Sequence, residues 1–233
     1  MPEITFIVDD LRGVILAEDN QDFRADGFAA LQKTLGEAQT TACARPLEII
    51  KPPDDFFDVK SKETTVRIAG YYHNSLTEGP GRRSSVLFQF CPLKCKGCYV
   101  PELHDKNSGA VISVKKLAEL LLDPNFERDG VSILGGEPFA QPDALLTLVK
   151  ELRSKNCPHI ICYSGYTLES LREKSLIYKS IGDILDEIDI LIDGAFVESL
   201  ASSAGLWTGS GNQRVIDLRT NAKYRKNIIH GKR

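Results

Sequence analysis

From Thr65 onward, short apolar segments alternate with amphipathic segments, and this alternation constrains the fold more than any other feature of the chain. The expected strands are Ser85–Phe90, Gly130–Leu134, His159–Tyr163, Asp189–Ile192 and Arg214–Leu218. The expected helices are Val114–Leu122, Asp143–Ser154 and Leu168–Lys179. Such alternation predicts an α/β fold with a mostly parallel sheet and helices outside it. About five strands are too few for a closed eight-stranded barrel, so we expect a partial, open β/α barrel.

The N-terminal part has a different pattern. Residues 3–18 alternate apolar and polar positions around a turn, which predicts a pair of strands, and residues 24–38 carry apolar residues at helical spacing. Prolines and an acidic-aromatic segment then interrupt regular structure. We therefore expect a small α+β extension over residues 1–65 and a core domain over residues 66–233.

Composition limits the class of protein. The formal net charge of −3 provides no basic stripe for nucleic acid, and no apolar run approaches the roughly 20 residues that span a bilayer. The first residues lack the basic and apolar regions of a signal peptide. Six cysteines in such a chain indicate metal ligands and buried thiols rather than a disulfide framework. We expect a cytoplasmic protein.

Three cysteines, Cys91, Cys95 and Cys98, form a C-x3-C-x2-C group directly after the expected strand Ser85–Phe90. A structural zinc site needs four protein ligands, whereas a cubane iron–sulfur cluster held by three thiolates leaves one iron without a protein ligand. That iron can bind and activate a small molecule. The alternative is a zinc knuckle in which His104 or Cys162 provides the fourth ligand.

A second motif, Gly135-Gly136-Glu137-Pro138, follows the expected strand Gly130–Leu134. The glycines can expose backbone groups to a ligand, Glu137 can offer a carboxylate to an ammonium group, and Pro138 fixes the turn. Alone, such a tetrapeptide is more often a simple turn. One β-α unit after a three-cysteine loop, it is a specific signal.

Together these motifs resemble those of the radical S-adenosylmethionine (SAM) enzymes. The resemblance implies a [4Fe–4S] cluster held by the three cysteines, SAM bound at its open iron, and a fold of the radical SAM type. Further segments resemble those of enzymes that activate glycyl-radical proteins, in particular anaerobic ribonucleotide reductase. These segments are Glu78–Arg83 (EGPGRR), Cys95–Tyr99 (CKGCY), Tyr163–Thr167 (YSGYT), Asp189–Val197 (DILIDGAFV) and Gly211–Leu218 (GNQRVIDL).

Other candidate site residues come from their positions near strand ends. Ser164 and Asp193 are expected beside the cluster; Asp193 either accepts from SAM or forms a turn with the following glycine. Gly97 and Tyr99 flank a cluster ligand and can meet SAM, although a packing role suits Tyr99 equally. Arg83 is the candidate catalytic residue, because it can bind a carboxylate or the partner's backbone, while a solvated surface arginine is its commoner role.

The resemblance implies an activating enzyme that abstracts hydrogen from a glycine of a partner protein, most simply anaerobic ribonucleotide reductase, with flavodoxin or ferredoxin as electron donor. Two alternatives remain: a radical SAM enzyme acting on a small molecule, as deazapurine synthases do, and a non-catalytic zinc-binding interaction module.

Two features of the sequence depart from the family pattern. Residues 1–65 have no recognised counterpart, and Phe90 stands where relatives commonly have glycine.

Overall fold

The computed structural model describes residues 6–9, 14–17 and 63–219, and the chain divides into two compact units, Met1–Leu47 and Glu48–Arg233. In the first unit β1 (Phe6–Asp9) pairs antiparallel with β2 (Val14–Ala17), which confirms the strand pair expected within residues 3–18. The helix expected over residues 24–38 lies outside the described residues. The boundary near residue 65 stays a prediction.

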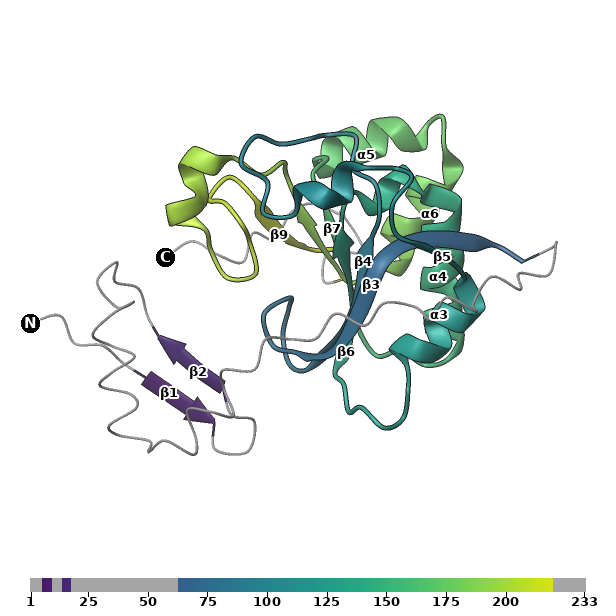
Figure 1. The fold of residues 1–233 in the computed structure, drawn as a ribbon, viewed down its shortest axis with the longest axis horizontal. Helices are drawn as coiled ribbons and strands as arrows, with labels where there is room; N and C mark the ends of the chain where they lie inside the picture. The colour runs from purple at the N-terminus through teal and green to yellow at the C-terminus, as the bar shows by residue number, and fades with distance from the viewer. Residues whose placement is uncertain (1–5, 10–13, 18–62, 220–233) are drawn as a thin grey trace, which may run out of the picture. The chain divides into compact units, whose positions relative to one another are not determined.

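The second unit contains an open seven-stranded sheet with the order β5-β3-β4-β6-β7-β8-β9 (Figure 1). Four neighbouring strands, β4, β6, β7 and β8, run parallel, whereas β3, β5 and β9 pair antiparallel at the two sides. The bounds are β3 Thr65–Ser75, β4 Arg83–Phe88, β5 Ala110–Ser113, β6 Gly130–Gly135, β7 Ile160–Ser164, β8 Ile190–Asp193 and β9 Arg214–Asp217. All five expected strands are present, and β3 and β5 were not expected.

The helices are α3 (Val114–Leu121), α4 (Pro142–Ser154), α5 (Leu168–Ser175) and α6 (Lys179–Glu187), with short 3-10 turns η2 (Pro101–His104), η3 (Pro138–Ala140) and η4 (Glu198–Ser203). The helix expected over Leu168–Lys179 is confirmed from Leu168 to Ser175 and is wrong beyond Ser175. The chain turns after α5, where the N–H groups of Ile177 and Tyr178 both donate to the carbonyl of Lys174. Ile177 therefore stays exposed, and α6 packs back against α4.

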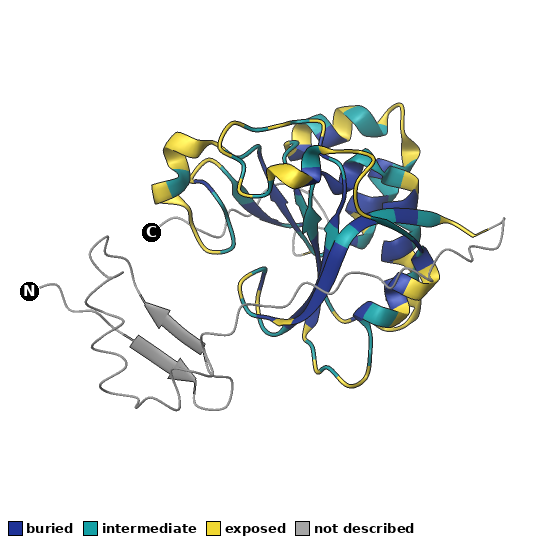
Figure 2. Ribbon diagram, in the orientation of Figure 1, coloured by how far each residue is buried: buried dark blue, intermediate teal, exposed yellow. Residues whose placement is uncertain are grey.

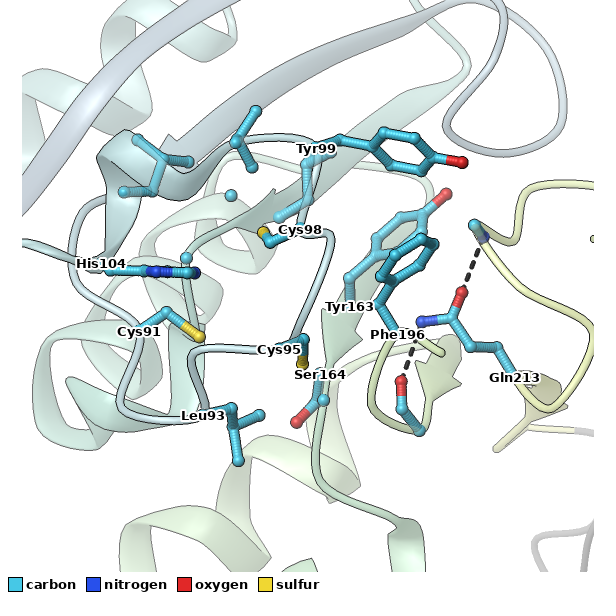
Figure 3. A pocket seen from close by; sticks show the side chains of 18 residues that line it. Cys91, Leu93, Cys95, Cys98, Tyr99, His104, Tyr163, Ser164, Phe196 and Gln213 are labelled. Atoms are coloured by element: carbon cyan, nitrogen blue, oxygen red, sulfur yellow. Dashed lines mark hydrogen bonds between the residues drawn. The ribbon is translucent and has the colours of Figure 1, made fainter. Parts of the chain in front are cut away.

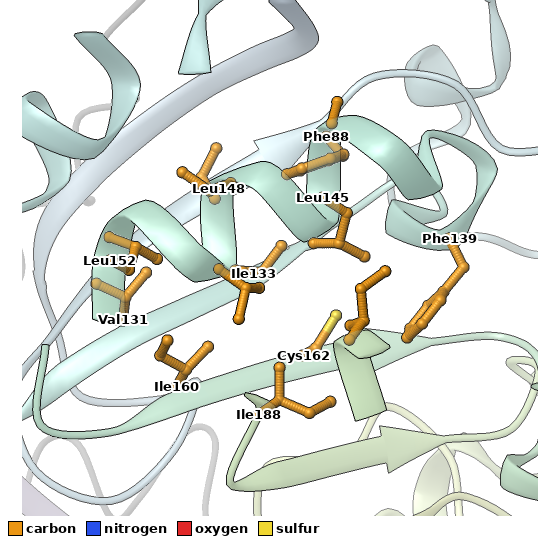
Figure 4. Packing of buried hydrophobic residues seen from close by; sticks show 14 of the residues in the cluster. Phe88, Val131, Ile133, Phe139, Leu145, Leu148, Leu152, Ile160, Cys162 and Ile188 are labelled. Atoms are coloured by element: carbon orange, nitrogen blue, oxygen red, sulfur yellow. The ribbon is translucent and has the colours of Figure 1, made fainter. Parts of the chain in front are cut away.

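The main hydrophobic core lies between the sheet and these four helices (Figures 2 and 4). Leu145, Leu148 and Leu152 of α4 pack over Ile133 of β6 and Ile160 of β7 (Figure 4). Side chains alternate between the two faces of a strand, so Ile161 points to the other face. There it forms a smaller cluster with residues of β8 and β9. The helices therefore cover one face of the sheet.

The parallel strands bring four loops to one edge of the sheet. In the β4–β6 register Phe88 pairs with Gly135, and in the β7–β8 register Ser164 pairs with Asp193, so the carboxyl ends of these strands are neighbours. This edge is where open α/β sheets bind ligands. Within the described ranges, no helix combines the length and apolar character needed to cross a bilayer.

Candidate active site

The three cysteines lie on a tightly curled loop after β4. The loop has positive φ at Phe90 (78°), Lys94 (48°) and Gly97 (70°), and the N–H of Cys98 donates to the carbonyl of Cys95. The φ of 70° at Gly97 lies in the left-handed region that favours glycine, and the Glu198 side chain lies close to this residue. The loop therefore follows a fixed path past η4.

All three thiols are free and face one cavity (Figure 3). Burial raises the pKa of the Cys91 thiol, although backbone N–H groups of Leu93 and Lys94 partly oppose that shift. A thiol in this setting stays protonated until a metal replaces the proton. The three cysteines are therefore free thiols that line one cavity.

The cavity has a volume of about 280 Å³ and joins the cysteine loop to the other strand-end loops. Its lining is largely apolar and aromatic, with few polar side chains. The lining residues are Cys91, Leu93, Cys95, Cys98, Tyr99, Val100, Leu103, His104, Leu134, Gly135, Gly136, Tyr163, Ser164, Gly165, Gly194, Phe196, Gly209 and Gln213. Such a pocket, apolar with a few convergent polar groups, is typical of small-molecule sites.

Two glycines of the second motif, Gly135 and Gly136, line the cavity, and close packing explains why both are glycine. A Cβ on Gly135 would lie 2.5 Å from the Phe88 nitrogen, and one on Gly136 would lie 2.3 Å from the Phe90 carbonyl oxygen. Backbone hydrogen bonds join Gly136 to Phe88 and Glu137 to Phe90, each at 2.8 Å. The motif is therefore attached directly to the base of the cysteine loop.

The carboxylate of Glu137 lies away from the cavity, contrary to the expectation that it is offered to a ligand. Glu137 is fully buried, and its oxygens accept from the N–H groups of Phe139 (3.0 Å) and Gly165 (2.8 Å) and from the Ser164 hydroxyl (3.0 Å). Burial raises its pKa to about 7. Glu137 thus holds Ser164 and Gly165, which do line the cavity, in a fixed position behind it.

Asp193 also differs from expectation, because it neither lines the cavity nor forms a simple turn. It is fully buried, with its oxygens 2.8 Å and 2.5 Å from the Arg214 guanidinium and 2.6 Å from the N–H of Leu168. The pairing of Arg214 with Asp193 and Glu169 raises the pKa of Arg214. Asp193 therefore joins β8 and β9 to the start of α5.

Arg83 was expected to be a catalytic residue, and its position in the structure contradicts that expectation. It is the first residue of β4, at the opposite end of the strand from Cys91, and its side chain is fully buried. Its guanidinium donates to the carbonyls of Val131 (2.7 Å) and His159 (3.2 Å) and to the Ser132 hydroxyl (2.5 Å). Burial lowers its pKa to about 10. The arginine connects β4 to β6 and to the residue before β7, and it lies at the end of the sheet away from the cavity.

Two other expected cofactor-binding residues, Tyr99 and Pro138, lie at the mouth of the cavity and behind its wall, respectively. Tyr99 is 71% exposed and packs against Phe196 with ring centroids 4.8 Å apart, at the mouth of the cavity. Pro138 is buried in η3 behind the cavity wall. Sequence reasoning did not assign Phe196 or Tyr163 to the site. Both stand at or just after strand ends, and that position was the signal available for them.

A family model described as a 4Fe-4S single cluster domain matches residues 77–216. The anaerobic ribonucleoside-triphosphate reductase-activating protein of Salmonella typhimurium is 32% identical over 162 residues, which cover 66% of this chain and 100% of that protein. The chain belongs to the radical SAM activating enzymes. Another such activase, the protein of the same name from Escherichia coli K12, is 32% identical over 157 residues, 64% of this chain and 97% of its own length. The pyruvate formate-lyase-activating enzyme of Clostridium pasteurianum is 30% identical over 129 residues, 52% and 54% respectively.

Activases of this family use a [4Fe–4S] cluster and SAM, and the donor set fits them. Between residues 63 and 219, no three His, Cys, Asp or Glu side chains converge as ligands of a single ion do. A cubane accepts each thiolate at a different iron, so its ligands need not converge on one point. Cys162 is fully buried in the core beneath α4 and cannot complete a zinc knuckle (Figure 4). Among the described residues, His104 also does not converge with the three thiols as ligands of one zinc ion, so the thiols suit a cluster better than zinc.

Proposed function

We propose that this activase uses a [4Fe–4S] cluster and SAM to generate a glycyl radical on a partner enzyme, and that the partner is anaerobic ribonucleotide reductase. The observation that carries the proposal is one cavity lined by three free thiols and by the Gly135-Gly136 backbone. When bound, cluster and SAM supply a 5′-deoxyadenosyl radical that removes hydrogen from the partner's glycine. The names of the relatives support this choice of partner.

In this proposal Cys91, Cys95 and Cys98 hold the cluster. The backbone of Gly135 and Gly136 and the hydroxyl of Ser164 contact SAM, since these groups line the same cavity. Gly97 and Tyr99 contribute through the loop itself: Gly97 allows its close approach to η4, and Tyr99 covers the mouth.

Three further residues act without touching the cofactor. Glu137 and Pro138 hold the β6 and β7 loops, and Asp193 holds the β8 loop, through the buried contacts described above. Apolar walls formed by Leu93, Leu134 and Phe196 exclude water from the reactive radical.

The fold suits a macromolecular substrate. We infer that the open sheet curls as a partial β/α barrel whose mouth admits a glycine loop, and that residues 1–65 and 66–233 are separate domains. A flavodoxin or ferredoxin delivers the electron, and the reaction takes place in the cytoplasm, where such donors and anaerobic ribonucleotide reductase occur.

The test is anaerobic reconstitution with iron and sulfide, followed by SAM and dithionite, with and without anaerobic ribonucleotide reductase. We expect 5′-deoxyadenosine in the wild-type protein and a glycyl-radical signal in the reductase by electron paramagnetic resonance (EPR). Cys95→Ser should abolish both, while Cys157→Ser, a buried thiol outside the cavity, is the matched control and should retain both. SAM cleavage without any radical on the reductase would rule out this partner, and full turnover by Cys95→Ser would rule out the ligand assignment.

A further inference from the structure

Gln213 lines the cavity, and the proposed function gives it no role. It stands directly before β9, and in Figure 3 it lies on the opposite side of the view from Cys91, with Phe196 between them. Its side chain therefore belongs to the wall of the cavity that faces the cysteine loop.

The side-chain amide of Gln213 joins two separate loops. Its Oε1 atom accepts from the N–H groups of Gly209 (2.6 Å) and Ser210 (3.2 Å), and its Nε2 atom donates to the carbonyl of Gly194 (2.8 Å). Gly194 directly follows β8, whereas Gly209 and Ser210 lie in the loop before β9. Both glycines line the cavity, so one amide group connects the two loops at the cavity wall.

Two further side chains hold the backbone on either side of Phe196. Asn212 donates to the carbonyl of Ala195 at 2.8 Å. The Ser210 hydroxyl donates to the Asn212 side-chain oxygen (2.8 Å) and accepts from the N–H of Val197 (3.2 Å). The loop before β9 therefore fixes the residues before and after Phe196.

The segment that these bonds hold carries an aromatic wall of the cavity. Phe196 packs against Tyr99 with ring centroids 4.8 Å apart. A Cβ on Gly209 would lie 3.5 Å from the Phe196 ring and 3.8 Å from the Tyr99 ring, so Gly209 lies against both rings. Because Gln213 ties Gly209 to the end of β8, it determines where this aromatic wall lies.

We propose that Gln213 is a positioning residue for the adenosyl group of SAM; this rests on the proposed function. The groups of SAM that can ligate an iron, its amino and carboxylate groups, belong to the methionine end, so the adenosyl group extends away from the cysteines. Adenine is a flat aromatic ring system, and aromatic side chains such as Phe196 and Tyr99 pack favourably against such rings. Gln213 acts through these two rings, since its own amide is engaged by the two loops.

The experiment measures, by calorimetry on the anaerobically reconstituted protein, the dissociation constants of SAM and of 5′-methylthioadenosine. The second compound carries the adenosyl group without the amino-acid part. Gln213→Ala removes the bridge between the loops, and Gln213→Glu keeps the acceptor oxygens but loses the donor to Gly194. Ser202→Ala, an exposed change on η4, is the control.

We expect both dissociation constants to rise about fivefold to tenfold in Gln213→Ala and by a similar factor in Gln213→Glu. Ser202→Ala should match the wild type. Iron content and the EPR spectrum at saturating SAM should stay the same in all variants, because the cluster end of the cofactor is unaffected.

Unchanged dissociation constants in Gln213→Ala would overturn the inference. So would weaker binding of SAM alone, since the effect would then lie at the methionine end. If Gln213→Ala loses iron, Gln213→Glu decides by the same two constants, and wild-type values there would show that the residue shapes only its own loop. If the wild-type protein takes up no cluster or does not bind SAM, it is the proposed function that fails.

Discussion

Replacing Glu137 by Gln should change how the stability of the protein depends on pH. The carboxylate is fully buried, and its donors are neutral: two backbone N–H groups and one hydroxyl. Burial therefore raises its pKa from 4.5 to about 7. Between these values the folded state binds more protons than the unfolded state, so the stability contribution is complete below pH 4.5 and is lost as pH rises through 7.

The size of the effect follows from the pKa change. A difference of one pKa unit corresponds to about 1.4 kcal/mol, so ionisation of Glu137 lowers the free energy of unfolding by about 3 kcal/mol between pH 4.5 and 8. Gln has nearly the same shape and does not ionise. The free energy of unfolding of the wild type minus that of Glu137→Gln should therefore fall by about 3 kcal/mol across this range.

The assay is urea unfolding of the reduced apoprotein at several pH values, followed by fluorescence of Trp207, the single tryptophan. Taking the difference from the variant cancels the titration of other groups. Glu173→Gln, an exposed change on α5, is the control and should leave the difference flat. If the difference in free energy of unfolding between the wild type and Glu137→Gln also does not change with pH, then burial does not raise the pKa of Glu137 as described here.

Three other substitutions test neighbouring parts of the account. Gly136→Ala should cost about 1–3 kcal/mol of unfolding free energy and reduce iron uptake, because its Cβ would lie 2.3 Å from the Phe90 carbonyl oxygen. Normal values in both measurements would contradict the packing argument. Arg83→Lys should lower the free energy of unfolding by about 2–4 kcal/mol, since one ammonium cannot replace the guanidinium bonds. SAM cleavage per folded chain should stay the same, and lost turnover in the folded variant would restore a direct role for Arg83. Asp193→Asn should cost about 2–3 kcal/mol by weakening the pair with Arg214, again read by denaturation, and an unchanged stability would show the pair to be unimportant.

Much of the sheet was predictable because its central strands are short, apolar and followed by loops with distinctive residues. β3 was missed since its eleven residues mix Arg67 and His73 with apolar positions, and its register shifts twice against β4. β5 has only four residues and is defined by its pairing with β3. Such pairings depend on contacts distant in sequence, which local patterns do not contain.

In the site, strand ends predicted which residues lie near the cavity but not where their side chains point. Ser164 and the two glycines line it as expected. The carboxylates of Glu137 and Asp193 instead accept from backbone N–H groups behind the cavity, that of Phe139 in η3 and that of Leu168 at the start of α5. The hydrogen bond between Leu168 and Asp193 joins loops that are distant in sequence, so the sequence alone could not predict it.

Phe90, the residue before the first cysteine, has an unusual backbone conformation for a non-glycine residue. Its φ of 78° lies in the region that favours glycine, which is the residue expected at this position from the family resemblance. The residue before the first cysteine therefore has a backbone conformation that is strained for a side chain as large as phenylalanine.

The central claim is that three cysteines hold a cubane with one iron open to SAM, and EPR of the reduced, reconstituted protein tests it most directly. With about four irons per chain, addition of SAM should change the signal of the reduced cluster, because the cofactor binds to the cluster itself. A signal that SAM leaves unaltered, or a protein that retains zinc and takes up no iron, would contradict the account.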